Sequence, residues 1–138
     1  MIDENNVPPV DPDETVARYV IKKRNVRADK SIKPDEFIPY SYVDLSVNRH
    51  RDCTEDEIWH FGQQVATQLG NDLLGRTDLI VAACSIDPLS VVAKPIAGNP
   101  NHADITGYPP KKADQKALAL KIAAEASNLV VRLINTVT

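Results

Sequence analysis

The chain has 138 residues, a length typical of one domain, and its 43% hydrophobic and 25% charged residues match an ordinary globular protein. Only 5% of the residues are aromatic, so the core must be mainly aliphatic, and folding requires no metal or cofactor. The net charge of −3 argues against general nucleic-acid binding.

The cysteines and the N-terminus bear on the compartment. Cys53 and Cys84 form no CxxC pair, which favours a reducing environment. The N-terminus has neither the basic nor the apolar region of a signal peptide, and the longest apolar stretches are far shorter than the ~20 residues that span a bilayer. We therefore expect a soluble, cytoplasmic protein with no membrane partner.

Charge is distributed unevenly at the start of the chain. Residues 1–15 carry five acids, no base and three prolines, and their low apolar content predicts a disordered acidic tail before a single domain over 16–138. Residues 16–33 carry seven bases against one acid. This run could contact a nucleic-acid backbone, but it lacks an accompanying binding signature, so we favour a solvated surface or a protein partner. The acidic tail folding over it explains it equally well.

Two strands are predicted ahead of the first helix. Residues 16–22 are β-branched and aromatic enough for a strand, and residues 23–39, which are basic and contain two prolines, predict a surface loop. Residues 40–47 alternate with a period of two, which is typical of a half-buried strand. Its expected core-facing residues are Val43, Leu45 and Val47.

Residues 54–69 carry the clearest helical signature. Thr54 and Glu57 form a capping box at the start, and Gly70 supplies the end signal. Apolar residues recur between them at helical spacing and predict one buried stripe. The stripe consists of Ile58, Phe61, Val65 and Leu69.

The second half of the chain predicts more strands and a long helix. Residues 79–84 and 89–95 have the composition of two strands joined as a hairpin. Residues 102–108 are expected to form either a short strand or an extended segment. Residues 112 to about 135 are rich in Ala and Leu and predict a C-terminal helix packed on the sheet. Its core face would be Leu118, Ile122, Ala126, Leu129 and Leu133.

This order of elements predicts the fold class. We expect an α+β fold, with an antiparallel or mixed sheet of four to five strands packed against two helices on one face.

Two histidines and a cysteine have the residue types of metal ligands. The spacing of His50, Cys53 and His60 does not form a zinc signature, and we predict no metal and no cofactor. Signatures of nucleotide-binding folds and of standard hydrolases are also missing.

The segment around His102 is the more informative candidate. His102 and Asp104 lie two residues apart, on the same side of an extended segment, and could form an acid–base pair. Lys111 and Lys112 precede the predicted helix, whose free N–H groups attract anions. The alternative is a polar turn in which His102 bonds to the backbone and the lysines are solvated.

Arg49 and Arg51 follow a predicted core strand, a common position for functional residues. If they converged with His102 and Lys111, they would complete a basic pocket able to bind phosphate or cleave RNA. The usual alternative is an exposed charged turn.

Three segments resemble a group of small bacterial proteins to which no function is assigned. The shared patterns are LSVxR at residues 45–49, EIWxxG at 57–62 and HAxIxGxPxxK at 102–112. They occur in the same order, within a resemblance that spans roughly residues 16–126. The resemblance implies a bacterial cytoplasmic protein, and it points towards defence or toxin-linked gene clusters.

Two hypotheses of function follow. The leading one is an accessory or interaction module that acts through a protein partner, using the basic segment and the exposed faces of the helices. The alternative is an enzyme for a phosphate-containing substrate, such as RNA or a nucleotide. In that case His102 would be the acid or base, Asp104 would orient it, and Arg49, Arg51 and Lys111 would stabilise the anion.

Overall fold

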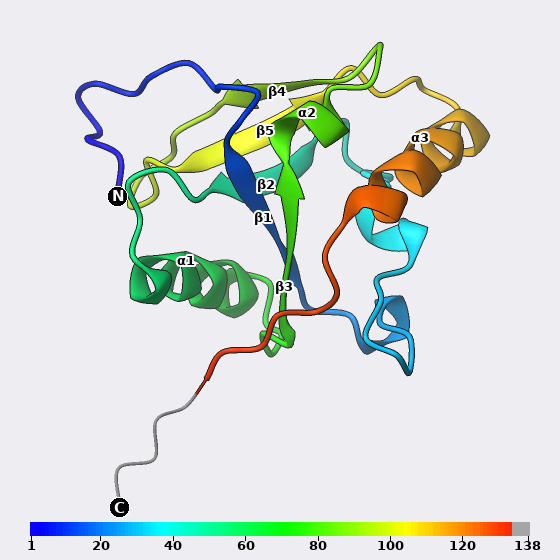
Figure 1. Ribbon diagram of the computed structural model, residues 1–138, viewed down its shortest axis with the longest axis horizontal. Coiled ribbons are helices and arrows are strands. Elements are labelled where there is room, and N and C mark those ends of the chain that lie inside the picture. Colours follow the sequence, from blue (N-terminus) through cyan, green and yellow to red (C-terminus); the bar gives the residue numbers. More distant parts are fainter. Residues whose placement is uncertain (134–138) are drawn as a thin grey trace, which may run out of the picture.

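The computed structural model describes residues 1–133 and confirms the α+β prediction. Its centre is a five-stranded sheet in the order β3-β1-β2-β5-β4, in which every neighbouring pair is antiparallel (Figure 1). The strands are β1 (Thr15–Val20), β2 (Leu45–Arg49), β3 (Gly75–Ile80), β4 (Ser90–Ala93) and β5 (His102–Thr106). The helices are α1 (Glu55–Gln68), α2 (Val81–Cys84) and α3 (Lys112–Glu125), with short 3-10 turns η1 (Lys23–Asn25) and η2 (Pro34–Phe37).

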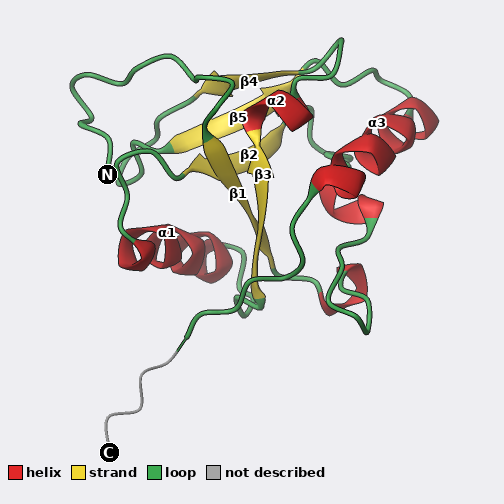
Figure 2. Cartoon of the chain, in the orientation of Figure 1, coloured by secondary structure: helices red, strands yellow, loops and turns green. Residues whose placement is uncertain are grey.

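Helices cover both faces of the sheet, so the expectation that both long helices share one face is wrong. Alternation along β1 explains the arrangement, because successive side chains of a strand point to opposite faces. Val16 and Val20 join the main core with α3, whereas Ala17 and Tyr19 pack against α1. Figure 2 shows α1 and α3 well apart, on different sides of the strands.

Helix α1 confirms the prediction for residues 54–69. The hydroxyl of Thr54 accepts the N–H of Glu57, and the Glu57 carboxylate accepts the N–H of Thr54, which completes the capping box. The buried face differs in detail, because Leu69 is 54% exposed whereas Trp59 is buried. Gly62 makes the close approach possible, since a Cβ there would lie 2.6 Å from Cε1 of Tyr19 on β1.

Replacing Thr54 by Ala should lower the free energy of unfolding by about 1 kcal/mol, because the N–H of Glu57 in the first turn of α1 loses the hydroxyl that accepts it. Chemical denaturation of the variant measures the change. Gln63→Ala, at an exposed position of the same helix, is the control and should change stability by less than about 0.5 kcal/mol. A loss no greater than that of the control would show that the capping box contributes nothing.

The strand predicted over residues 40–47 begins five residues later. Tyr40, Tyr42 and Val43 are 65%, 75% and 78% exposed, and they lie in a loop. Only Leu45 and Val47, which belong to β2, face the core. The expectation for Val43 is therefore wrong, because alternation extended past the point where β1 and β5 provide partners for β2.

The predicted hairpin of residues 79–84 and 89–95 does not form. The first strand, β3, ends at Ile80, and the next four residues form α2. Strands β3 and β4 lie at opposite edges of the sheet, and β4 pairs with β5 instead. Of the two alternatives for residues 102–108, the short strand is confirmed, and it ends at Thr106 as β5.

Helix α3 ends at Glu125, ten residues before the predicted end. Leu118 and Ile122 are buried as expected, but residues 126–130 are extended and lie along the outer edge of β3. Leu129 is half-buried through this contact, whereas Leu133 is 87% exposed and faces no core. The last two residues of the predicted helix fall outside the described part of the chain.

The N-terminal segment differs from the expected disordered tail, because residues 1–14 lie against the domain. Ile2 is 2% exposed, and its N–H donates to Oδ1 of Asn101 at 2.9 Å. Val10 packs on the main core, and the carbonyl of Pro12 accepts the N–H of Ala82 at 3.0 Å. The few apolar residues of the segment thus find a surface to cover. Within residues 1–133, no helix has the length and hydropathy needed to cross a bilayer.

Candidate functional site

His102 and Asp104 come together as their spacing predicts. Both lie on β5 and point to the face of the sheet that carries α1, and Nε2 of His102 is 3.8 Å from Oδ1 of Asp104. The other ring nitrogen, Nδ1, lies 2.8 Å from the carbonyl oxygen of Lys94, so Nδ1 carries the proton and donates it. Nζ of Lys94 is 3.6 Å from Oδ2 of Asp104.

This geometry favours a structural cluster. The side chains of His102 and Asp104 are only 12% and 9% exposed, and Asp104 forms an ion pair with Lys94. A general base must reach the proton it removes, and little of either side chain reaches solvent. The contacts with Lys94 link the end of β4 to β5, and this is the role that the distances support.

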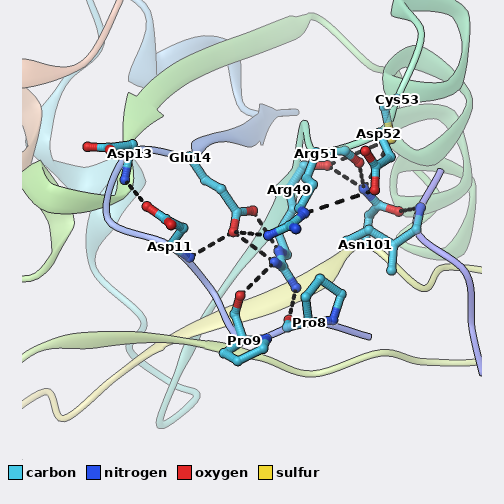
Figure 3. A network of polar contacts seen from close by, with 11 residues as sticks. Pro8, Pro9, Asp11, Asp13, Glu14, Arg49, Arg51, Asp52, Cys53 and Asn101 are labelled. Atoms are coloured by element: carbon cyan, nitrogen blue, oxygen red, sulfur yellow. Dashed lines mark hydrogen bonds and ion pairs between the residues drawn. The ribbon is translucent and has the colours of Figure 1, made fainter. Parts of the chain in front are cut away.

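Arg49 is wholly buried, and its guanidinium is already occupied (Figure 3). Nε and Nη2 each donate to one carboxylate oxygen of Glu14 at 2.7 Å. Nη1 and Nη2 donate to the carbonyls of Pro8 and Pro9 at 2.8 and 3.2 Å. The side chain also points to the opposite sheet face from His102, because Arg49 alternates with Asn48, the residue paired with His102. It therefore neither binds an external anion nor meets His102.

Glu14 is the counterion that the sequence did not reveal. Burial alone would raise the pKa of Glu14, but the hydrogen bonds from Arg49 and from the backbone N–H of Asp11 hold this pKa below its usual value. The carboxylate is therefore ionised at neutral pH, and the pair fixes the N-terminal segment to β2.

Arg51 lies in acidic surroundings. Its side chain is 39% exposed, with Nη1 3.7 Å from Glu14 and Nε 3.9 Å from Asp52. It lines an open hollow of about 440 Å³. The other lining residues are Asp11, Asp13, Glu14, Thr15 and His50. Such a hollow disfavours phosphate, because carboxylates outnumber the cations around it.

Lys111 and Lys112 are at the N-terminus of α3, where Lys111 caps the helix without a side-chain hydrogen bond. Nζ of Lys112 lies 5.1 Å from the ring centroid of Tyr40. His102 begins β5 and the lysines follow its other end, so the length of the strand, roughly 13 Å, separates them. The candidate residues thus occupy three separate places, and the basic pocket they would have formed is not assembled.

The described residues also hold no group of three or more His, Cys, Asp or Glu placed to bind a metal ion. Cys53 and Cys84 are both free thiols. Burial raises the pKa of Cys84 to about 12, so this thiol does not ionise at neutral pH.

A different surface is prominent in the structure. The sequence interpretation named the exposed faces of the helices but missed the loop that adjoins one of them. Residues 40–44, which we term the tyrosine loop, expose Tyr40, Tyr42 and Val43, and the contact of Tyr40 with Lys112 joins the loop to α3. On the helix, four apolar residues recur at i, i+4, i+7 and i+11 and are all exposed. This α3 stripe consists of Ala113, Ala117, Leu120 and Ala124. Its spacing was visible in the sequence as a second apolar stripe.

Comparison of the chain with protein-family models, with curated proteins and with solved structures gives no match. Its function therefore has to be inferred from its own residues.

Proposed function

We propose that this protein is an interaction module that binds a partner protein through the tyrosine loop and the α3 stripe, together termed the partner surface. The observation that carries the proposal is the exposed apolar stripe on α3. A helix at a protein surface needs one apolar side, and α3 already buries Leu118, Ala119 and Ile122 in the core. The opposite stripe contributes nothing to that packing.

The side chains of the partner surface suit a protein interface. Leu120 is 55% exposed, and Tyr40 and Tyr42 are more exposed still. Tyrosines are enriched at interfaces because they bury a large area while fixing few torsions. The loop and the helix adjoin where Tyr40 contacts Lys112. Exposed apolar and aromatic residues that gather in this way mark an interaction site more often than scattered ones do.

Charge indicates the chemistry of the partner. Residues 111–125 carry four lysines and two acids, in a chain whose net charge is −3. Lys112 and Lys116 lie next to the α3 stripe, one turn apart. Cations around an apolar centre select an acidic partner and speed its association. We infer an acidic protein with an apolar anchor.

Two observations bear on the compartment and on the identity of the partner. Two free thiols, Cys53 and Cys84, support a reducing compartment such as the cytoplasm. The resemblance to small bacterial proteins directs the search for the partner first to products of defence or toxin-linked gene clusters. The phosphate-enzyme alternative has no geometric support, since Arg49 is saturated and Lys111 is remote from His102.

The test compares Leu120→Glu with a matched control, Leu69→Glu. The two leucines are 55% and 54% exposed, on α3 and at the end of α1 respectively. Tagged full-length wild type and both variants are used for affinity purification from the native host, and captured proteins are quantified. We expect an acidic protein whose capture falls at least about tenfold with Leu120→Glu and is unchanged with Leu69→Glu.

Raising the salt concentration should also weaken the capture, because exposed charges are screened. If both variants reduce the capture equally, or if neither variant reduces it, the interface lies elsewhere. If the wild-type protein captures no protein in stoichiometric amount, the proposal is contradicted.

A further inference from the structure

The two edges of the sheet are treated differently by the chain. The outer edge of β3 is covered by residues 126–130. Arg76 exchanges two backbone hydrogen bonds with Val130, at 2.9 and 2.8 Å, and the carbonyl of Asp78 accepts the N–H of Ser127 at 3.0 Å. The N–H of Asp78 donates to Oγ of Ser127 at 2.9 Å. This edge therefore offers no free backbone groups at Arg76 or Asp78 to another strand.

The outer edge of β4 remains open. The N–H of Lys94 donates to the carbonyl of His102 at 2.9 Å, which makes these two residues a hydrogen-bonded pair of the β4–β5 ladder. Because such pairs alternate, the N–H and C=O groups of Val91 and Ala93 point away from β5. Within residues 1–133, these four groups have no hydrogen-bond partner outside the ladder.

We propose that β4 pairs antiparallel with β4 of a second copy of this chain, with Val92 on the two-fold axis. Val91 then lies opposite Ala93 of the second copy, and Ala93 opposite its Val91. Each of these two pairs exchanges two hydrogen bonds, so all four outward groups of each chain are satisfied. Both contributing residues face the edge and are equidistant from Val92, so the strand is complementary to itself.

The side chains support this register. Val92, which is 41% exposed, would meet Val92 of the second copy in a non-hydrogen-bonded pair, a favourable arrangement for β-branched residues. Lys94 would lie opposite Ser90, so no like charges face each other, and Asp104 already balances Lys94. Registers shifted by two residues bring in Pro95, which has no N–H, or Leu89, whose N–H donates to Ile86.

The assembly would stop at two copies. Pro88 and Pro95 flank β4 and prevent the pairing from lengthening. The covered β3 edge prevents a third chain from adding at the other side of the sheet. This interface uses residues other than those of the partner surface.

The first test is the oligomeric state by analytical ultracentrifugation over a concentration series. Val91→Pro removes an outward N–H while leaving the β4–β5 hydrogen bonds intact. We expect a concentration-dependent dimer in the wild type and a dissociation constant raised by roughly tenfold or more in Val91→Pro, since two of four interchain bonds are lost. A wild type that stays monomeric up to millimolar concentration overturns the proposal.

The second test does not depend on how well the proline variant folds. Val92→Cys places two thiols across the axis, within reach of a disulfide under mild oxidation. Ser46→Cys is the control, because Ser46 is exposed on the interior strand β2. We expect Val92→Cys to cross-link rapidly, while Ser46→Cys and the wild type remain monomeric on a denaturing gel. That result supports the register. Equal cross-linking of both variants, or none in Val92→Cys, overturns it.

Discussion

Replacing Glu14 by Gln is expected to lower the free energy of unfolding by about 3 kcal/mol at neutral pH. The substitution keeps the shape of the side chain but leaves the guanidinium of Arg49, which is 0% exposed, without a counterion. Removing one partner of a buried ion pair is strongly destabilising, because the remaining charge stays desolvated without a counterion. Denaturant unfolding of variant and wild type measures the difference.

The same pair predicts a pH dependence. Because the folded-state pKa of Glu14 lies below the ordinary value of 4.5, ionisation of this group stabilises the wild type above that pH. This stabilisation is lost as the pH falls through the folded-state pKa. The Glu14→Gln variant has no ionisable group at this position and shows no such loss. The stability difference between wild type and Glu14→Gln should therefore shrink below pH 4.5.

Asp13→Asn is the control for Glu14→Gln, because it removes the same charge from an exposed neighbour. We expect its stability to stay within about 0.5 kcal/mol of the wild type. If Glu14→Gln were as stable as Asp13→Asn at neutral pH, the carboxylate of Glu14 would not be holding the N-terminal segment to Arg49.

Replacing Gly75 by Ala should destabilise the protein by about 2 kcal/mol, the cost of losing two backbone hydrogen bonds and the packing of residues 126–130. A Cβ at this position would overlap with the carbonyl oxygen of Val130. The sign of the change in stability distinguishes this contact from a backbone effect, because Ala in place of a strand glycine ordinarily stabilises a protein by about 0.5–1 kcal/mol. Thermal unfolding measures the change.

Hydrogen exchange locates the effect of Gly75→Ala. The amides of Arg76 and Asp78, which are bonded to Val130 and Ser127, should exchange faster in the variant. Those of β5 should change only in proportion to the global stability. A stabilised variant, or one with unchanged protection at Arg76, would mean that residues 126–130 do not cover β3.

Features encoded locally could be predicted from the sequence. The capping box of Thr54 and Glu57 lies within four residues, and α1 begins where it predicts. The i, i+2 spacing of His102 and Asp104 placed them on one face of β5, because neighbouring residues of a strand determine each other's direction.

Features that depend on residues distant in the sequence could not be predicted. The end of α3 coincides with the pairing of residues 126–130 with β3, some fifty residues earlier in the chain, although apolar residues continue at helical spacing beyond it. Arg49 looked like a free cation at a strand end because its counterion, Glu14, lies 35 residues upstream. Alternation over residues 40–47 described a strand that has no partner before Leu45.

The partner surface became evident only from the exposure of its side chains in the structure. Leu118 and Ile122 were predicted to face the core and do so, but no prediction was drawn from the second stripe of Ala113, Ala117 and Leu120. The exposure of the first stripe, together with the tyrosine loop, is what separates an interaction surface from a second core face.

Hydrogen exchange with the captured partner shows whether α3 and the tyrosine loop bind it. Full-length protein is measured free and saturated with the purified partner. We predict protection over residues 40–44 and 112–125, with α1 unchanged. Protection over α1 or the basic residues 22–33, with residues 112–125 unaffected, would contradict the account and place the interface elsewhere.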